Sequence, residues 1–207
     1  MKRLLNFPAL LIFLLLIALI QGKVMGQSGH IENNSQVMVE MESAADLNGW
    51  TSGETTDSGK VIKYLHWTGE DFFNTPGKHI LEYKINIKES GTYRFIWNTK
   101  VGKGDSPTDF NDTWLRIPDA SDFYGNKNGH IVHPKGICKD DCPNGAGADG
   151  WFKVYSSGTV NWTWSTRTSD NDAHLIYARF DKPGIYTVQV SARSNGHFLN
   201  SFLIYKE

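Results

Sequence analysis

The segment Thr92-Tyr93-Arg94-Phe95-Ile96-Trp97-Asn98-Thr99-Lys100 predicts the class of fold. Its three rings, on Tyr93, Phe95 and Trp97, occupy every second position. Successive side chains of a β-strand point to opposite faces, so these rings share one face. The segment therefore predicts a strand with one buried face and with Trp97 in the core.

The same two-residue periodicity recurs along the chain, and we find no convincing amphipathic helix after residue 26. Turn-forming Gly, Pro, Asn and Asp separate the segments, as in Asp181-Lys182-Pro183-Gly184. About ten short strands of this kind predict a β-sandwich or barrel. The first and last strands alternate alike and are expected to pair. The expected strands are 37–42, 60–67, 78–87, 92–100, 113–117, 151–155, 159–166, 174–180, 185–193 and 198–206.

Residues 1–26 have the features of a secretory signal peptide. Lys2 and Arg3 give a positive start, and residues 9–20 form an unbroken apolar run. Val24-Met25-Gly26 then offers small residues for signal peptidase. The alternative is an uncleaved membrane anchor, but the run is shorter than the roughly 20 residues that span a bilayer.

Cleavage leaves residues 27–207, a length that suits one domain. Lys+Arg falls from 21 to 18 and Asp+Glu stays at 22, so the net charge changes from −1 to −4. A mildly acidic chain is a poor candidate for binding nucleic acid or anionic membranes through bulk charge. We expect a secreted domain, extracellular or, in a Gram-negative bacterium, periplasmic or on the cell surface, with no stable membrane insertion after cleavage.

Cys138 and Cys142 are the only cysteines of the chain. In an oxidising compartment such a close pair predicts a disulfide, which would shape a small loop locally. Zinc binding is the alternative, although no second Cys/His pair lies in register. The pair lies within residues 118–150, which are rich in Gly, Asp, Asn and Pro. So long a loop is usually functional or disordered, and the disulfide favours an ordered functional loop.

Four motifs follow one another in a specific order. They are Val39-Glu40-Met41-Glu42, Glu89-Ser90-Gly91-Thr92-Tyr93-Arg94-Phe95, Asp181-Lys182-Pro183-Gly184-Ile185-Tyr186-Thr187-Val188 and Phe198-Leu199-Asn200-Ser201-Phe202-Leu203-Ile204. In this order they resemble the carbohydrate-binding modules of the family-six and family-thirty-five kind, which have a galactose-binding-like jelly-roll fold. The resemblance implies an all-β jelly-roll β-sandwich of two antiparallel sheets, here with one long disulfide-containing loop.

The resemblance also implies a structural calcium ion between the first and last strands, which carries over to Glu40, Glu42 and Asn200. Glu40 and Glu42 lie two apart on an expected strand and so share a face, where their charges repel unless a cation lies between them. Calcium prefers hard oxygen ligands. The family's usual Asp is Asn at position 200, which weakens the site. Two solvated acids on an edge strand are the alternative.

A glycan site on the loops at one end of the sandwich, or on its concave face, is the second implication of the resemblance. The segment Phe110-Asn111-Asp112-Thr113-Trp114-Leu115-Arg116 places an amide, a carboxylate and a ring together. Arg193 and His197 lie just before the last strand and suit an acidic or sulfated sugar. For each ring, the alternative to ligand binding is packing in the core. For each polar group, the alternative is a role in an ordinary turn or a hydrogen-bonded loop. The candidate ligand-binding residues are Trp67, Asn111, Asp112, Trp114, Trp151, Arg193 and His197.

Two further segments carry polar or aromatic groups. Trp162 and Trp164 share one face of the expected strand 159–166. The polar turn Asp170-Asn171-Asp172-Ala173-His174 is a candidate for a second calcium ion or a sugar contact. The residues of this polar turn would be unremarkable if they only formed the turn.

The leading hypothesis is a secreted, non-catalytic domain that is stabilised by calcium, binds a polysaccharide or oligosaccharide, and works alone or with a polysaccharide-degrading enzyme complex. A small β-jelly-roll glycoside hydrolase or polysaccharide lyase is the first alternative. Hydrolysis needs two carboxylates across the scissile bond, such as Asp112 with Asp172 or Glu70, and nothing in the spacing selects them. A lyase would rely on Arg193 with His197.

A surface adhesion or structural protein is the remaining alternative. It would use the sandwich for protein contacts, bind no glycan and tolerate Trp67→Ala.

Overall fold

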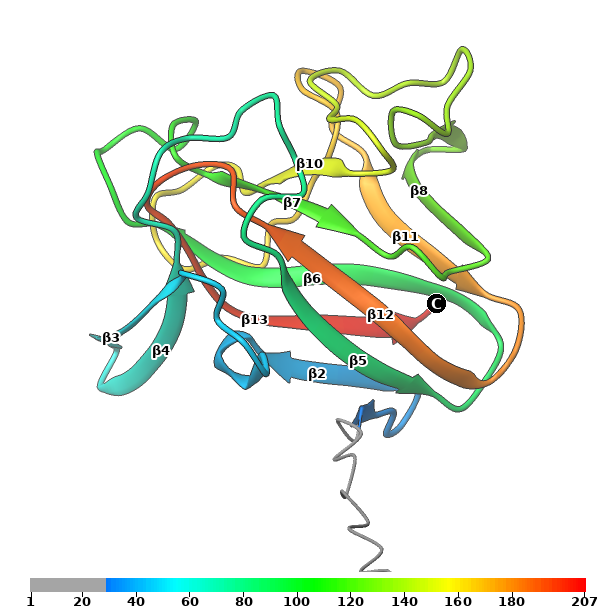
Figure 1. Ribbon diagram of the computed structural model, residues 1–207, viewed down its shortest axis with the longest axis horizontal. Helices are drawn as coiled ribbons and strands as arrows, with labels where there is room; N and C mark the ends of the chain where they lie inside the picture. The colour runs from blue at the N-terminus through cyan, green and yellow to red at the C-terminus, as the bar shows by residue number, and fades with distance from the viewer. Residues whose placement is uncertain (1–28) are drawn as a thin grey trace, which may run out of the picture.

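A computed structural model describes residues 29–207, so the expected signal peptide lies outside the described residues. Two β-sheets face each other across a hydrophobic core (Figure 1). This confirms the predicted all-β sandwich. Within residues 29–207, no helix is long and apolar enough to cross a membrane.

The two sheets are mostly antiparallel, and among the described strands only β1 and β5 pair in parallel. The smaller sheet has the order β1 (His30–Ile31), β5 (Leu81–Ile87), β12 (Gly184–Ser191), β7 (Asp112–Arg116) and β10 (Phe152–Tyr155). The larger sheet has the order β3 (Thr51–Asp57), β4 (Lys60–His66), β13 (His197–Lys206), β6 (Gly91–Val101), β11 (Leu175–Phe180), β8 (Asp122–Lys127) and β9 (His130–Val132), and β2 (Gln36–Glu40) also pairs with β13.

Strand β6 lies in the middle of the larger sheet and buries its three alternating rings, as predicted. Tyr93 packs edge-on against Phe180, with ring centroids 5.4 Å apart, and Phe95 stacks with Phe202 at 5.5 Å. Burial of each such side chain stabilises the fold by about 1.5–3 kcal/mol. Trp97 is also fully buried. The periodicity of β6 therefore positions the core between the two sheets.

The first and last expected strands pair as predicted, with β2 antiparallel to β13. However, β2 ends at Glu40, and Met41–Ser43 forms a short 3-10 turn, η1. Met41 is buried there, and its backbone carbonyl accepts a hydrogen bond from the Tyr83 hydroxyl, which holds the turn against the core. The prediction that Glu40 and Glu42 share one strand face is therefore wrong, because Glu42 lies on the turn.

The prediction of a strand at residues 159–166 is also wrong. Only Thr163 forms a bridge, with Thr99. The hydroxyls of Thr159 and Thr163 accept hydrogen bonds from backbone amides two residues on, and such local bonds compete with a strand ladder. Trp162 and Trp164 therefore do not share a strand face.

The expected loop 118–150 contains a hairpin that the sequence analysis missed. Strands β8 and β9 are joined through Asn128 and Gly129, which both have positive φ, and Asn-Gly is a typical two-residue hairpin turn. The predicted disulfide between Cys138 and Cys142 is present in the segment that follows. The two-residue strand β1 and the seven-residue strand β3 were also missed.

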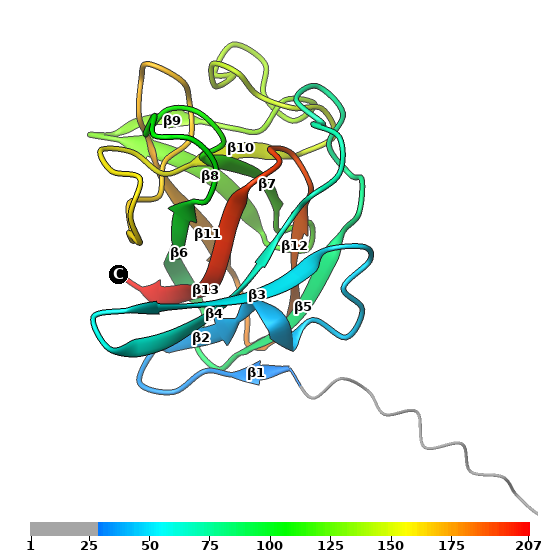
Figure 2. The ribbon, with the colours of Figure 1, turned by 90° about the vertical axis from the view of Figure 1, so that its left-hand side faces the viewer.

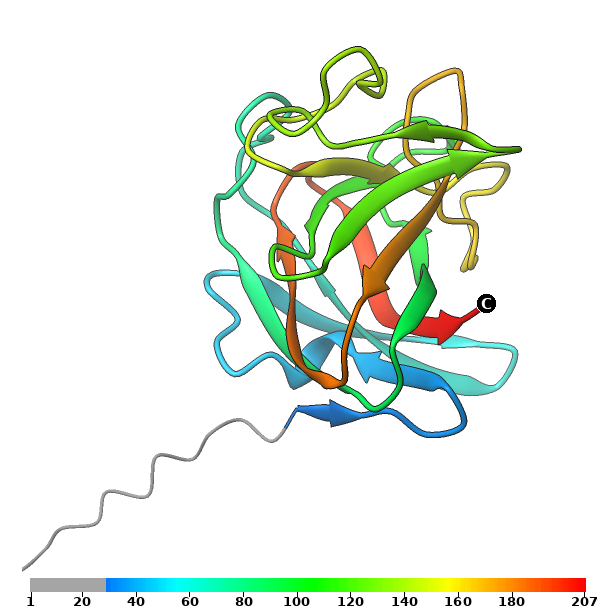
Figure 3. The ribbon, with the colours of Figure 1, turned by 90° about the vertical axis from the view of Figure 1, so that its right-hand side faces the viewer.

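Several long connections meet at one end of the sandwich, which we call the loop end. Strands β7, β11 and β13 begin there, and β6, β10 and β12 end there, as the register of their pairs shows. Figures 2 and 3 show the connections around β9 and β10 on the side of the molecule away from β1. The loop end therefore combines segments that lie far apart in the sequence.

Candidate functional site

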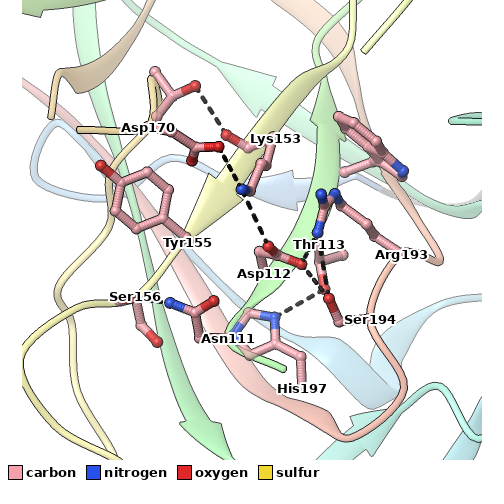
Figure 4. A network of polar contacts seen from close by, with 12 residues as sticks. Asn111, Asp112, Thr113, Lys153, Tyr155, Ser156, Asp170, Arg193, Ser194 and His197 are labelled. Atoms are coloured by element: carbon pink, nitrogen blue, oxygen red, sulfur yellow. Dashed lines mark hydrogen bonds and ion pairs between the residues drawn. The ribbon is translucent and has the colours of Figure 1, made fainter. Parts of the chain in front are cut away.

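A buried ion pair forms the base of the loop end (Figure 4). Asp112, the first residue of β7, accepts hydrogen bonds on Oδ1 from Arg193 Nη1 and from the Ser194 hydroxyl. Asp112 and Arg193 are only 5% and 8% exposed. Removing two charges from water is costly unless partners satisfy them. Asp112 has such partners, whereas Arg193 Nε has no hydrogen-bond partner among residues 29–207 and its guanidinium lies over the Trp114 ring instead. The pair therefore fixes the start of β7 to the connection before β13.

Lys153 on β10 extends this pair toward the surface. Its Nζ lies 3.6 Å from Asp112 Oδ2 and 2.7 Å from Asp170 Oδ2. One ammonium group thus bridges a buried carboxylate and a more exposed one. The contact with Asp170 is a charge-assisted hydrogen bond, which is stronger than a neutral one, and the contact with Asp112 is a longer ion pair.

Tyr155 lies on the same face of β10 as Lys153. Its hydroxyl donates a hydrogen bond to the Ser169 carbonyl over 3.1 Å. Burial, and then the negative charge of Asp170, raise the pKa of the phenol above its usual value. Tyr155 therefore stays protonated at neutral pH, and its oxygen can still accept a hydrogen bond.

These groups surround a pocket of about 310 Å³, which we call the loop-end pocket. An ammonium, a phenol, a carboxylate and two amides converge on it, so it offers both donors and acceptors. Ligand pockets in proteins typically begin at about 300 Å³. The lining residues are Thr108, Asn111, Lys153, Tyr155, Asp170 and Asn171.

Four of the predicted ligand-binding residues meet in this region: Asn111, Asp112, Arg193 and His197 (Figure 4). Asn111 lines the pocket, although its amide nitrogen already donates to the carbonyls of Pro107 and Ser156. Asp112, Arg193 and His197 are buried and do not line the pocket. Asp112 contacts the lining residue Lys153, Arg193 contacts Asp112, and His197 contacts Thr113, the residue after Asp112.

His197 is fully enclosed. Its Nδ1 shares a hydrogen bond of 2.8 Å with the Thr113 hydroxyl, and its Nε2 has no partner among residues 29–207. Burial lowers the pKa of His197 to about 4, although the nearby Asp112 carboxylate raises it and Arg193 lowers it further. The imidazole is therefore neutral at neutral pH and makes no contact with solvent.

The three tryptophans that were predicted to stack on sugars are buried, so the core alternative describes them better. Trp67 packs against Trp50 and His79, with ring centroids 6.2 and 4.1 Å away. The Trp114 ring lies 4.9 Å from the Arg193 guanidinium, and the Trp151 ring is covered by a second arginine, Arg116, at 4.5 Å. A sugar needs an exposed ring face, which none of the three presents. Because Trp67 is a core residue, Trp67→Ala does not separate the binding and adhesion hypotheses.

Aromatic side chains do reach the surface elsewhere. Tyr64 and Phe198 stack face to face on the outer side of the larger sheet, with centroids 4.2 Å apart. His66 and Trp162 adjoin them, at 5.5 and 5.9 Å from Tyr64. We call these four residues the aromatic patch. Trp164, on the same connection as Trp162, is 40% exposed.

The residues predicted to hold calcium line one surface pocket, together with Lys60 and Lys63. Partial burial, and then the charge of Glu42, raise the pKa of Glu40, so the two carboxylates interact electrostatically. Their oxygens fit calcium in type. Asn200 fits less well, because its amide oxygen already accepts hydrogen bonds from Asn98 and Ser201.

The placements disfavour both catalytic alternatives. Both oxygens of Asp112 face cations, so this buried carboxylate is not free to act on a substrate. Asp172 pairs with Lys127 instead. His197 is enclosed and Arg193 is committed to Asp112, so neither reaches a polysaccharide in the way a lyase requires.

Lys153 and Tyr155 were not among the predicted ligand-binding residues. The alternation of residues 152–155 contained a signal for them, because Phe152 and Val154 are buried and the intervening side chains must face outward. Asp170 and Asn171 belong to the polar turn that was noted as a candidate sugar contact. What the sequence could not show is that β10 and this turn meet in space.

No protein-family model matches the sequence, and no curated protein matches it. Among solved structures, the chain is similar to the carbohydrate-binding module CBM6cm-2 of Cellvibrio mixtus lichenase 5A, in complex with cellotriose. The TM-score is 0.45 and the identity 16%, over 83% of this chain and 97% of that one.

Two further similarities are to the C-terminal CBM6 of LamC from Zobellia galactanivorans and to the GH26-CBM35 β-(1,4)-mannanase of Podospora anserina. The first has a TM-score of 0.41 and 16% identity, over 83% of this chain and 99% of that one. The second has 0.44 and 14%, over 84% of this chain and 28% of that one. These structures include the two kinds of module that the four motifs resemble. Their TM-scores are below 0.5, so these similarities alone do not assign a function to this chain.

Proposed function

We propose that this protein is a secreted carbohydrate-binding domain that holds its ligand in the loop-end pocket and does no chemistry on it. The observation that carries this proposal is the convergence of Lys153, Tyr155, Asp170 and Asn171 on one pocket of about 310 Å³. Sugar hydroxyls both donate and accept hydrogen bonds, and the four groups offer both functions. The ligand is a polysaccharide or oligosaccharide, because an open surface pocket admits one unit of a longer chain.

The buried network beneath the pocket supports binding by fixing its geometry in advance. Lys153 is held by both Asp112 and Asp170, and Asp112 is held in turn by Arg193. A preorganised site loses less conformational entropy on binding. Under this proposal, the predicted residues Asp112, Arg193 and His197 position the groups that contact the ligand.

The proposal includes a calcium ion that stabilises the fold at Glu40 and Glu42. It is supported by the two carboxylates beside one surface pocket at the junction of β2 and η1. Asn200 would contribute its oxygen only by giving up a present hydrogen bond. Lys60 and Lys63, at the rim of the same pocket, partly balance the acidic charge without an ion.

A polysaccharide array tests the function, with the purified protein applied in calcium and again with a chelator. A specific hit is then measured by calorimetry for Asn171→Ala and Tyr155→Phe. Asn171 is exposed and the second change removes one hydroxyl, so both variants should fold. Each loses a hydrogen bond worth about 0.5–1.5 kcal/mol, which predicts an affinity loss of about twofold to tenfold.

The matched control is Tyr64→Ala in the aromatic patch, with thermal unfolding recorded for every variant. Binding that survives Tyr64→Ala but weakens in the two pocket variants supports the proposal. Loss of binding in Tyr64→Ala alone would indicate that the ligand binds at the aromatic patch on the larger sheet, and would refute binding in the loop-end pocket. A folded protein that binds no glycan would refute the function and favour adhesion.

A further inference from the structure

Three potential metal ligands meet where the β8–β9 hairpin touches the connection before β11. Among residues 29–207, His130, Asp172 and His174 form the group whose ligand atoms all lie within 4.8 Å of one another. His130 Nδ1 and His174 Nε2 are 2.9 Å apart. The cluster is separate from the surface pocket lined by Glu40, Glu42 and Asn200, which we call the Glu40 pocket, and none of its residues lines the loop-end pocket.

The surroundings of His174 prepare one ring nitrogen to bind a metal. His174 is fully buried, and its Nδ1 lies 2.5 Å from the backbone carbonyl of Asp172. A carbonyl oxygen only accepts, so Nδ1 carries the proton and Nε2 keeps its lone pair. Histidines that bind metals are usually oriented by such a second hydrogen bond. The lone pair faces His130.

We propose that this cluster binds a divalent transition metal, with zinc as the best fit, through His130 Nδ1, His174 Nε2 and one carboxylate oxygen of Asp172. Imidazole suits zinc, copper and nickel, whereas calcium prefers oxygen ligands. Zn–N bonds of about 2.0–2.1 Å place two nitrogens of a tetrahedral ion roughly 3.3 Å apart. His130 is exposed, so its ring is free to move the few tenths of an ångström required.

Lys127 competes with a metal ion for the carboxylate of Asp172. Its Nζ contacts Asp172 Oδ1 at 2.5 Å and so occupies one oxygen of the carboxylate. The other oxygen, Oδ2, lies 3.9 Å from His174 Nδ1. Binding at Asp172 would therefore displace or share with Lys127, and removal of the ammonium group should strengthen metal binding.

The bound ion joins the hairpin turn to the connection 169–174. Three protein ligands leave a fourth position for water or for an outside ligand. The same connection carries Asp170 and Asn171, so the ion would also restrain one wall of the loop-end pocket. This last consequence rests on the proposed function, whereas the metal site itself does not.

The test is a calorimetric titration of zinc into purified protein that carries no polyhistidine tag and has been freed of metal by a chelator. The wild type should bind one ion saturably at this cluster. His130→Ala removes a ligand from an exposed position and should weaken binding at least tenfold without unfolding the protein. Lys127→Met should tighten binding severalfold. His30→Ala, in β1 on the far side of the molecule (Figure 2), should leave it unchanged.

Excess calcium should not compete, which separates this site from the Glu40 pocket. Absence of saturable zinc binding in the wild type would overturn the proposal. So would equal affinities of the wild type and His130→Ala, or weaker binding by Lys127→Met. These readouts involve no glycan, so they stand even if the protein binds no carbohydrate.

Discussion

The fully buried His197 makes the stability of the protein depend on pH. Its pKa is about 4 in the folded chain, against an ordinary value of 6.5. As the pH falls below 6.5, the unfolded chain takes up a proton that the folded chain does not bind until about pH 4. Unfolding is therefore favoured progressively across this window, by about 3 kcal/mol in total. Above pH 6.5 the group has no further effect.

Urea unfolding of the wild type and of His197→Gln at a series of pH values measures this contribution. Glutamine does not titrate and retains a polar group opposite the Thr113 hydroxyl. We expect the wild type to lose about 3 kcal/mol more than the variant between pH 6.5 and pH 4. Parallel curves for the two proteins would show that His197 is not the responsible group.

For single residues, the sequence predicted chemical type better than exposure. Asn111, Asp112, Arg193 and His197 do meet, but all four are buried. The burial of Trp114 could not be predicted from its own strand, because residues from other segments of the chain cover its ring. Pro76 and Gly147 lie close together against it, so close that a Cβ on Gly147 would be 2.8 Å from the ring. Such a cover depends on tertiary packing that local periodicity does not encode.

Within the long connection after β9, Gly145 is the residue through which the segment supports the loop-end pocket. It has a φ of +70°, and an added Cβ would lie 2.2 Å from Asp170 Oδ2. Gly145→Ala should displace Asp170 from Lys153 and weaken carbohydrate binding severalfold. The backbone strain itself should cost about 1 kcal/mol of the free energy of unfolding.

Gly158→Ala is the matched control for this change. Gly158 has a similar φ of +84°, but an added Cβ would meet nothing within 4 Å. The two variants should lose similar stability by thermal unfolding, and only Gly145→Ala should lose affinity by calorimetry. Equal affinities would mean that this segment does not shape the pocket.

Strands were predictable where one face is buried, and much less so where it is not. β6 alternates buried and half-buried residues along its length, and its bounds agree with the prediction within one residue. β3 and the hairpin of β8 and β9 lie toward the edges of the larger sheet, with weak apolar alternation. Their turns at Ser58-Gly59 and Asn128-Gly129, all with positive φ, were the available signal. The segment 159–166 failed for another reason, because it has aromatic alternation but forms only one bridge to β6, at Thr163, and local hydrogen bonds of Thr159 and Thr163 compete with a strand ladder.

Across the whole molecule, the N-terminal and C-terminal strands close the larger sheet together. β2 pairs with residues 201–205 of β13, and β4 pairs with residues 198 and 199 of the same strand. The bulge between these two pairings lies at Asn200, where the register of β13 against β6 shifts. The Glu40 pocket lies at this junction, so an ion bound there would join segments from both ends of the described chain.

Calcium should therefore raise the stability of the entire sandwich rather than that of one loop. An ion that binds only the folded state at a concentration 100 times its Kd contributes about 2.7 kcal/mol, and each kcal/mol raises the Tm of a chain this size by about 2–4 °C. We expect the melting temperature to rise by several degrees on addition of calcium and to return to its original value on chelation.

Glu42→Gln should abolish the rise, because it removes one of the two carboxylate charges. Glu82→Gln, an exposed carboxylate on β5, should retain it. An equal rise in Glu42→Gln would place the ion elsewhere, and no rise in the wild type would mean that Lys60 and Lys63 already balance the two acids.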